Sequence, residues 1–104
     1  MTDVLLPSDV LDRHREQIRA LLAAHGVSEA GVFGSVARGQ DDGRSDLDLI
    51  VAFRPGARRD LVRITDELEE VTGLSIDVVD QERVLDRARR TGIGYTILRD
   101  TVPL

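Results

Sequence analysis

The sequence contains no cysteine and no tryptophan, and only 1 tyrosine and 2 phenylalanines occur among its 104 residues. Without cysteine, the chain can form neither a disulfide framework nor a thiolate metal site. With so few aromatic side chains, the core must be built mainly from valine, leucine and isoleucine. Lysine is also absent, since all 14 basic residues are arginine. This absence excludes a lysine Schiff base and a P-loop lysine.

The chain also lacks a net positive charge and a long apolar run. Its 19 acidic residues outnumber the 14 basic ones, which gives a formal net charge of -5 at pH 7. Nonspecific binding to nucleic acid normally needs a basic face, so we expect no direct DNA or RNA binding. No apolar stretch approaches the roughly 20 residues needed to cross a bilayer, and the start of the chain has no basic leader. We therefore expect a soluble cytoplasmic protein.

The length and the apolar patterning predict a single small domain spanning residues 1–104. Helical spacing of apolar residues predicts a first helix that ends at His25. The segment Pro7–Asp9 is its start signal, with Ser8 as N-cap. Further helices are predicted over 61–72 and from the N-cap Asp80 to about residue 90, and strands over 30–33, 46–53 and 74–79. The segment 91–104 stays open, because its glycines weaken a helical prediction. The expected fold class is α/β (α+β), a small mixed β-sheet flanked by helices.

A strand-like run ends at Gly34 and Ser35, and one helical turn follows. Backbone N–H groups at such a helix start point outward and can hold a phosphate, to which the Ser35 hydroxyl adds a donor. Gly34 lets a ligand approach the backbone closely. The same dipeptide is also typical of an ordinary strand-to-helix turn, so by itself it leaves both interpretations open.

Three aspartates form the strongest chemical signal. Asp46 and Asp48 occupy positions i and i+2 of a predicted strand, so both carboxylates project from one face and can converge on a divalent metal. A solvated turn is the alternative for Asp46. Asp77 lies in the middle of a later predicted strand, where a buried carboxylate needs a cation or an arginine partner. If these strands are neighbours, all three carboxylates line one face, opposite the Gly-Ser turn.

The residue types in this cluster indicate which metal it would bind. Carboxylate oxygens without histidine or cysteine favour Mg²⁺ over zinc, with Mn²⁺ as an alternative. Three acids suit two ions, of which one holds the leaving phosphates and the other lowers the pKa of an attacking hydroxyl. The pattern therefore indicates a site that grips a triphosphate.

The segments 34–39, 45–51 and 76–79 together resemble the minimal nucleotidyltransferases of the DNA polymerase beta superfamily. The resemblance covers nearly the whole chain and implies a nucleotidyltransferase fold. It implies that Gly34 and Ser35 hold the triphosphate of ATP. It further implies that Asp46 and Asp48 bind metal, and that Asp77 completes the metal site or assists the nucleophile.

Arg38 resembles an arginine that many small members of this family carry after the Gly-Ser pair. The resemblance therefore implies a position for Arg38 near the phosphates. The alternative is a surface arginine that pairs with Asp41 or Asp42.

Small stand-alone members of the family resemble the MNT antitoxins of HEPN/MNT toxin-antitoxin pairs. This implies transfer of AMP from ATP to a tyrosine of a HEPN ribonuclease toxin, which silences the toxin. Because we expect a single domain without a second one to grip an acceptor, we also expect a partner or a second copy to supply that surface, in a hetero-oligomer or a homodimer. Two other functions stay open: a non-catalytic antitoxin that only binds its partner, and a nucleotide sensor that binds ATP without transfer.

Overall fold

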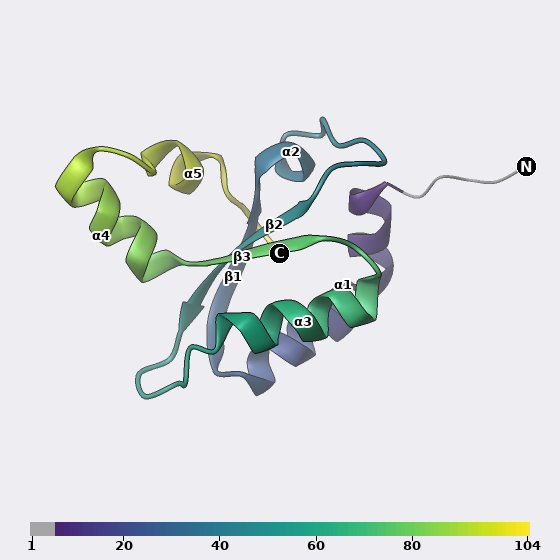
Figure 1. Ribbon diagram of the computed structural model, residues 1–104, viewed down its shortest axis with the longest axis horizontal. Coiled ribbons are helices and arrows are strands. Elements are labelled where there is room, and N and C mark those ends of the chain that lie inside the picture. Colours follow the sequence, from purple (N-terminus) through teal and green to yellow (C-terminus); the bar gives the residue numbers. More distant parts are fainter. Residues whose placement is uncertain (1–5) are drawn as a thin grey trace, which may run out of the picture.

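The computed structural model describes residues 6–104, which form a four-stranded sheet with helices on both sides (Figure 1). The elements in chain order are α1 (Pro7–Ala24), β1 (Val27–Phe33), α2 (Gly34–Ala37), β2 (Leu47–Phe53), α3 (Leu61–Thr72), β3 (Ile76–Asp80), α4 (Gln81–Thr91), α5 (Tyr95–Asp100) and β4 (Val102–Pro103). The strand order is β3-β2-β1-β4. Strand β1 runs antiparallel to β2 and β4, whereas β2 and β3 are parallel. The predicted mixed sheet flanked by helices is confirmed.

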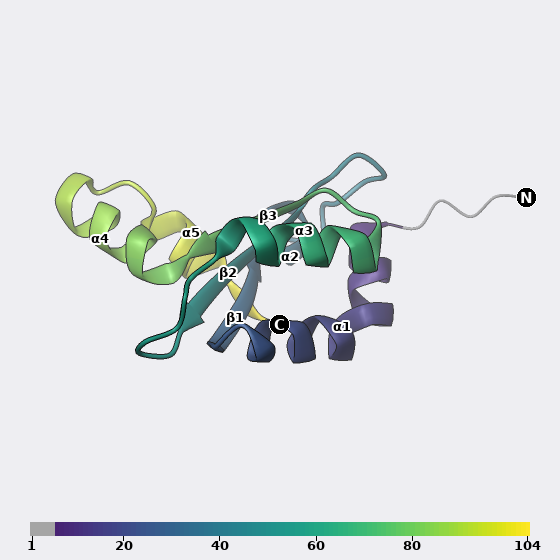
Figure 2. The same ribbon diagram turned by 60° about the horizontal axis from the view of Figure 1, so that its bottom comes forward.

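An aliphatic core lies between the sheet and the two longest helices, α1 and α3, which cover the same face of the sheet (Figures 1 and 2). Alternate residues of β2 point into this core, and Leu47, Leu49 and Val51 are completely buried. The helices supply the facing side chains, among them Ile18, Leu22, Ile64 and Leu68. The predicted alternation is therefore confirmed over 47–53 and leaves Asp48 on the opposite face of the sheet, whereas Asp46, predicted as the first strand residue, lies exposed just before β2.

The first helix begins two residues earlier than an N-cap at Ser8 would place it, so the prediction of Ser8 as N-cap is wrong. Leu6 is the N-cap, and its N–H donates to Asp9 Oδ2 at 3.1 Å. Pro7 takes the first helical position, where its missing N–H costs no hydrogen bond. The Ser8 N–H donates instead to Asp41 Oδ2 at 2.9 Å, which ties the loop after α2 to the start of α1.

The segment 91–104, which the sequence pattern leaves open, continues over the other face of the sheet. Helix α5 begins after Gly94, whose φ of 111° lies in the left-handed region. Thr101 then packs on the middle of β1, because a Cβ built on Gly31 would come within 2.3 Å of Thr101 Cγ2. Strand β4 pairs with β1 and completes the sheet. Within residues 6–104, no helix has the length and apolar character needed to cross a membrane.

Candidate active site

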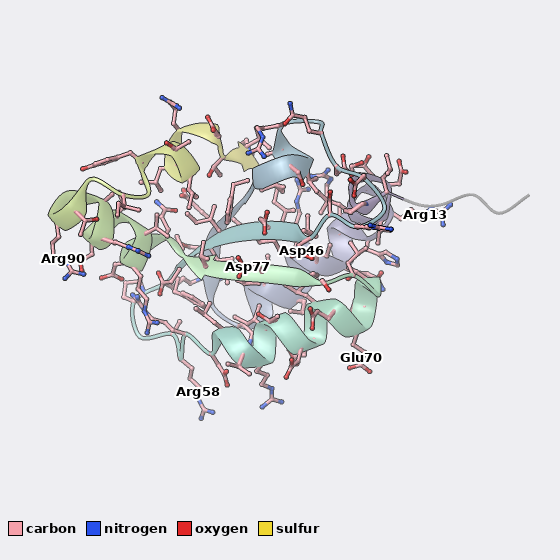
Figure 3. All side chains as sticks on the ribbon, turned by 45° about the horizontal axis from the view of Figure 1, so that its top comes forward. Arg13, Asp46, Arg58, Glu70, Asp77 and Arg90 are labelled. Carbon is pink, nitrogen blue, oxygen red and sulfur yellow. The ribbon has the colours of Figure 1, made fainter. Side chains whose placement is uncertain are left out.

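Two of the predicted aspartates lie directly opposite each other on neighbouring strands. Asp48 of β2 is in register with Asp77 of β3. Residues in register on parallel strands project from the same face, so both carboxylates stand on the face that α1 and α3 leave free. Asp46 lies just before β2 and is close enough to Asp48 for its charge to raise the pKa of that carboxyl; Figure 3 labels it together with Asp77. The fold therefore brings the three predicted carboxylates to one region.

The end of β1 carries Gly34 against the carboxylate of Asp48. Phe33, the last residue of β1, is paired with Asp48 across the antiparallel β1–β2 ladder. Gly34 has a φ of 74°, and a Cβ built on it would lie 2.2 Å from Asp48 Oδ2. The sequence indicates a glycine that admits a ligand, but it gives no signal of this contact within the chain. Glycine is required here both by the backbone conformation and by the position of Asp48.

The carboxylate of Asp48 is in an unfavourable environment for negative charge. Partial burial raises the pKa of Asp48 above its ordinary value of 3.8, and the charges of Asp77 and Asp46 raise it further. The positive charge of Arg38 acts in the opposite direction. Repulsion between several carboxylates is relieved when a cation binds among them. The electrostatics therefore suit a bound metal ion.

Arg38 lies close enough to Asp48 for its charge to act on that carboxylate. Its Nε donates to Gln40 Oε1 at 3.2 Å, and its charge lowers the pKa of Asp48. Asp41 is occupied by the Ser8 N–H, and Asp42 accepts the N–H of Arg44 at 2.8 Å. No ion pair from Arg38 to either aspartate is found in the part of the chain that the structure describes.

Asp77 is exposed, which corrects the expectation that its carboxylate is buried within the strand. Strand β3 is an edge strand, and only its alternate residues Ile76 and Val78 face the core. No arginine pairs with Asp77 in residues 6–104, so the alternative interpretation of Asp77, an ion pair with an arginine, is not found. The buried acid of β3 is Asp80, which accepts the Glu82 N–H at 2.9 Å as the predicted cap of α4 and pairs with Arg59 at 3.2 Å.

The chemistry of the three aspartates fits a hard divalent cation. All the donors are carboxylate oxygens, which Mg²⁺ and Mn²⁺ prefer, and their mutual repulsion favours a positive ion. Across residues 6–104, however, no three acidic or histidine side chains are already gathered as a ligand group. Asp46, Asp48 and Asp77 therefore stay a predicted ligand set.

Known proteins share this arrangement of sequence and fold. A family model described as "Nucleotidyltransferase domain" matches residues 11–102, so the chain belongs to the nucleotidyltransferase domain family. The chain is 34% identical over 97 residues to "Protein adenylyltransferase MntA" of Thermococcus cleftensis, which covers 84% of this chain and 92% of the relative. It is 44% identical over 66 residues to "Putative protein adenylyltransferase MJ0435" of Methanocaldococcus jannaschii, which covers 62% of this chain and 71% of the relative.

Solved structures agree with this assignment. One, "Structure of putative minimal nucleotidyltransferase", is 37% identical with a TM-score of 0.73, and the match covers 93% of this chain and 95% of that one. Another, "Crystal structure of the toxin-antitoxin with AMP-PNP", shares the fold at 22% identity and a TM-score of 0.56, over 62% of this chain and 55% of that one. The predicted nucleotidyltransferase fold is confirmed, and the chain is a minimal nucleotidyltransferase.

Proposed function

We propose that this chain transfers AMP from ATP to a tyrosine hydroxyl of a partner protein, and that the partner is a HEPN ribonuclease toxin. Modification silences the toxin, so the chain acts as its antitoxin in the cytoplasm. The observation that carries the proposal is the position of Asp48, in register with Asp77 and in contact with the Gly34 backbone. Transfer onto protein is supported by the named adenylyltransferase relatives. The HEPN toxin follows from the resemblance of the sequence to MNT antitoxins.

The residues of the site divide the binding of ATP among them. Backbone N–H groups at Gly34 and Ser35, with the Ser35 hydroxyl, hold the triphosphate. The Arg38 guanidinium offsets phosphate charge, since it is the strong phosphate donor that a chain without lysine can provide.

The aspartates serve the reacting end of the nucleotide. Asp46, Asp48 and Asp77 would hold Mg²⁺, as two ions or with Mn²⁺ as a substitute. Metal bound there supplies positive charge against the phosphate oxygens and the leaving group. Burial and the neighbouring acids raise the pKa of Asp48, and a cation bound there would offset this effect.

The transfer itself is a displacement at phosphorus. The tyrosine oxygen attacks the α-phosphorus, a new oxygen–phosphorus bond forms, and the bond from the α-phosphorus to the bridging oxygen breaks. Pyrophosphate leaves with that electron pair, and the hydroxyl proton passes to the carboxylate of Asp77. Asp77 suits this role because it is exposed, so a side chain from another protein can reach it.

Mass spectrometry of both proteins tests the proposal. The purified chain is mixed with ATP, Mg²⁺ and the folded product of the adjacent gene, which the proposal takes to be the HEPN toxin, and both proteins are weighed. We expect the partner to gain the mass of one or more AMP units. Asp48→Asn should greatly slow the gain, whereas the matched variant Asp66→Asn, on the exposed face of α3, should not.

The same experiment separates catalysis from binding. An active, folded partner that gains no mass would overturn transfer. If ribonuclease activity is nevertheless inhibited, and Asp48→Asn inhibits it equally well, the chain is a non-catalytic antitoxin that silences its partner by direct binding. Binding of ATP without transfer and without inhibition would indicate a nucleotide sensor.

A further inference from the structure

A cavity of about 530 Å³ opens on the same face of the sheet as the aspartates. Its floor includes Gly31 of β1 and Ile50 of β2, and Leu98 and Thr101 form a wall from the α5 side. Gln81, the first residue of α4, brings an amide to the lining. The volume lies in the range of about 300–1,000 Å³ that is typical of small-molecule sites. The roles proposed above for the aspartates and the Gly-Ser turn do not use this space.

The cavity lies in line with the proposed phosphate and metal residues along β2. The ladder pairs Phe33 with Asp48 and, further along β2, Gly31 with Ile50. Asp48 and Ile50 project from the same face, with Cα atoms about 7 Å apart at the usual rise of a strand. The order along this face is therefore Gly34 at one end, Asp48 in the middle, and the floor of the cavity beyond.

We propose that this cavity receives the adenosine part of ATP and that Gln81 recognises the base. This proposal rests on the function proposed above, because it takes Gly34 as the phosphate end of the nucleotide. If the triphosphate lies at Gly34 and the α-phosphorus lies at Asp48, the nucleoside extends in the opposite direction along β2. The cavity is the larger space on that side, and a pocket of about 150 Å³ beside Ala52, which Gln81 also lines, lies further along β2.

The lining of the cavity suits a purine. Ile50 and Leu98 present apolar surface to the flat faces of a ring. The half-buried Gln81 amide both donates and accepts hydrogen bonds, and adenine carries a donor and an acceptor side by side on one edge. On the edge that includes N7, guanine carries two acceptors instead, so the Gln81 amide, which lines the cavity together with Glu29, can distinguish adenine from guanine.

A glycine in β1 and an ion pair at the start of α4 hold this lining in place. Gly31 lets the α5 side approach the sheet closely, since a Cβ there would come within 2.3 Å of Thr101 Cγ2 and 3.5 Å of Ile50 Cγ2. Gln81 follows the buried cap residue Asp80, which is held by Arg59 at 3.2 Å. The start of α4 is thereby anchored to the loop before α3. The Gln81 amide therefore extends from a helix start that the Arg59–Asp80 ion pair holds in place.

Binding calorimetry without any acceptor protein tests the proposal. The dissociation constants of ATP, GTP and inorganic tripolyphosphate are measured in Mg²⁺ for the parent, Gln81→Leu and the control Gln17→Leu on the exposed face of α1. For Gln81→Leu we expect an increase of about 5-fold to 10-fold in the Kd of ATP, with the Kd of tripolyphosphate unchanged. The preference for ATP over GTP should fall as well. Gln17→Leu should match the parent throughout.

A second variant fills the cavity without touching the amide. Leu98→Trp should raise the Kd of ATP and leave that of tripolyphosphate unchanged, with circular dichroism as the check of folding. An unaltered Kd of ATP in Gln81→Leu would overturn the proposal, as would an equal loss of affinity for ATP and tripolyphosphate. A raised KM for the acceptor protein with unaltered ATP binding would assign the cavity to the acceptor and overturn it too. Because these affinities are measured without transfer, a failure of AMP transfer would leave this test intact.

Discussion

The carboxylate of Asp48 occupies the space that a side chain at Gly34 would need, since a Cβ on Gly34 would lie 2.2 Å from Asp48 Oδ2. The contact joins the end of β1 to Asp48 of β2, on the face of the sheet that α1 and α3 leave free. It places the proposed phosphate-binding turn directly beside a proposed metal ligand. A substitution at either residue is therefore expected to displace the other.

The first prediction is that Gly34→Ala destabilises the fold and abolishes AMP transfer. The φ of 74° at Gly34 strains any other residue, and the added methyl displaces Asp48. Gly73→Ala is the matched control, because Gly73 has a φ of 73° and nothing within 4 Å of its built Cβ. Urea unfolding should show a loss of about 1–2 kcal/mol for the control, which reflects the backbone conformation alone, and a larger loss for Gly34→Ala. Equal losses would contradict a steric role for Asp48.

The second prediction concerns the double variant Asp46→Asn with Asp48→Asn. Transfer of AMP should fall by a factor on the order of 10² or more, as is typical when an electrostatic group at a transition state is lost. Folding should survive or improve, because repulsion between the carboxylates is relieved. The measurements are transfer rates by mass spectrometry and unfolding in urea, with Asp66→Asn as control. Transfer at the parent rate would show that the metal assignment is wrong.

The third prediction is a dependence of stability on pH. Burial, followed by the charges of Asp77 and Asp46, raises the folded-state pKa of Asp48 above its ordinary value of 3.8. Between the two pKa values the folded protein binds more protons at Asp48 than the unfolded chain does, so this residue makes the free energy of unfolding fall as pH rises. The loss of unfolding free energy that Asp48 causes is absent below the pKa of the unfolded chain and complete above the pKa of the folded protein.

Comparison with Asp48→Asn isolates that contribution. In metal-free urea unfolding, the stability of the variant relative to the parent should increase as pH rises through this window and then stay level. Addition of Mg²⁺ above the window should stabilise the parent more than the variant, because the ion binds the deprotonated carboxylate. A difference that is independent of pH would refute the assigned pKa shift.

The fourth prediction distinguishes Arg38 from a surface arginine. Arg38→Gln should raise the KM for ATP roughly 10-fold, as expected for loss of a charge-assisted contact to phosphate. Arg44→Gln removes a charge from an exposed residue of the next loop and should leave the KM near that of the parent. Initial rates at several ATP concentrations provide the measurement. Equal effects of the two variants would indicate a general effect of net charge.

Local patterns in the sequence predict much of this fold. The alternation in 46–53 and the helical spacing in 61–72 agree closely with β2 and α3, because each pattern reports burial of one face within one element. Asp80 caps α4 as predicted. In contrast, the exposure of Asp77 depends on the edge position of β3 in the sheet, and no local pattern carries that information.

The sequence by itself determined which residues carry the chemistry: three aspartates on strand-like segments, a Gly-Ser turn, and arginine as the basic residue. Only the tertiary structure decided that Asp48 faces Asp77 in register, that its carboxylate meets Gly34, and that a cavity continues from them along β2. The physical reason is that register between distant strands is set by burial of their apolar faces against α1 and α3. Such packing joins residues far apart in the chain, and spacing along the sequence does not encode it.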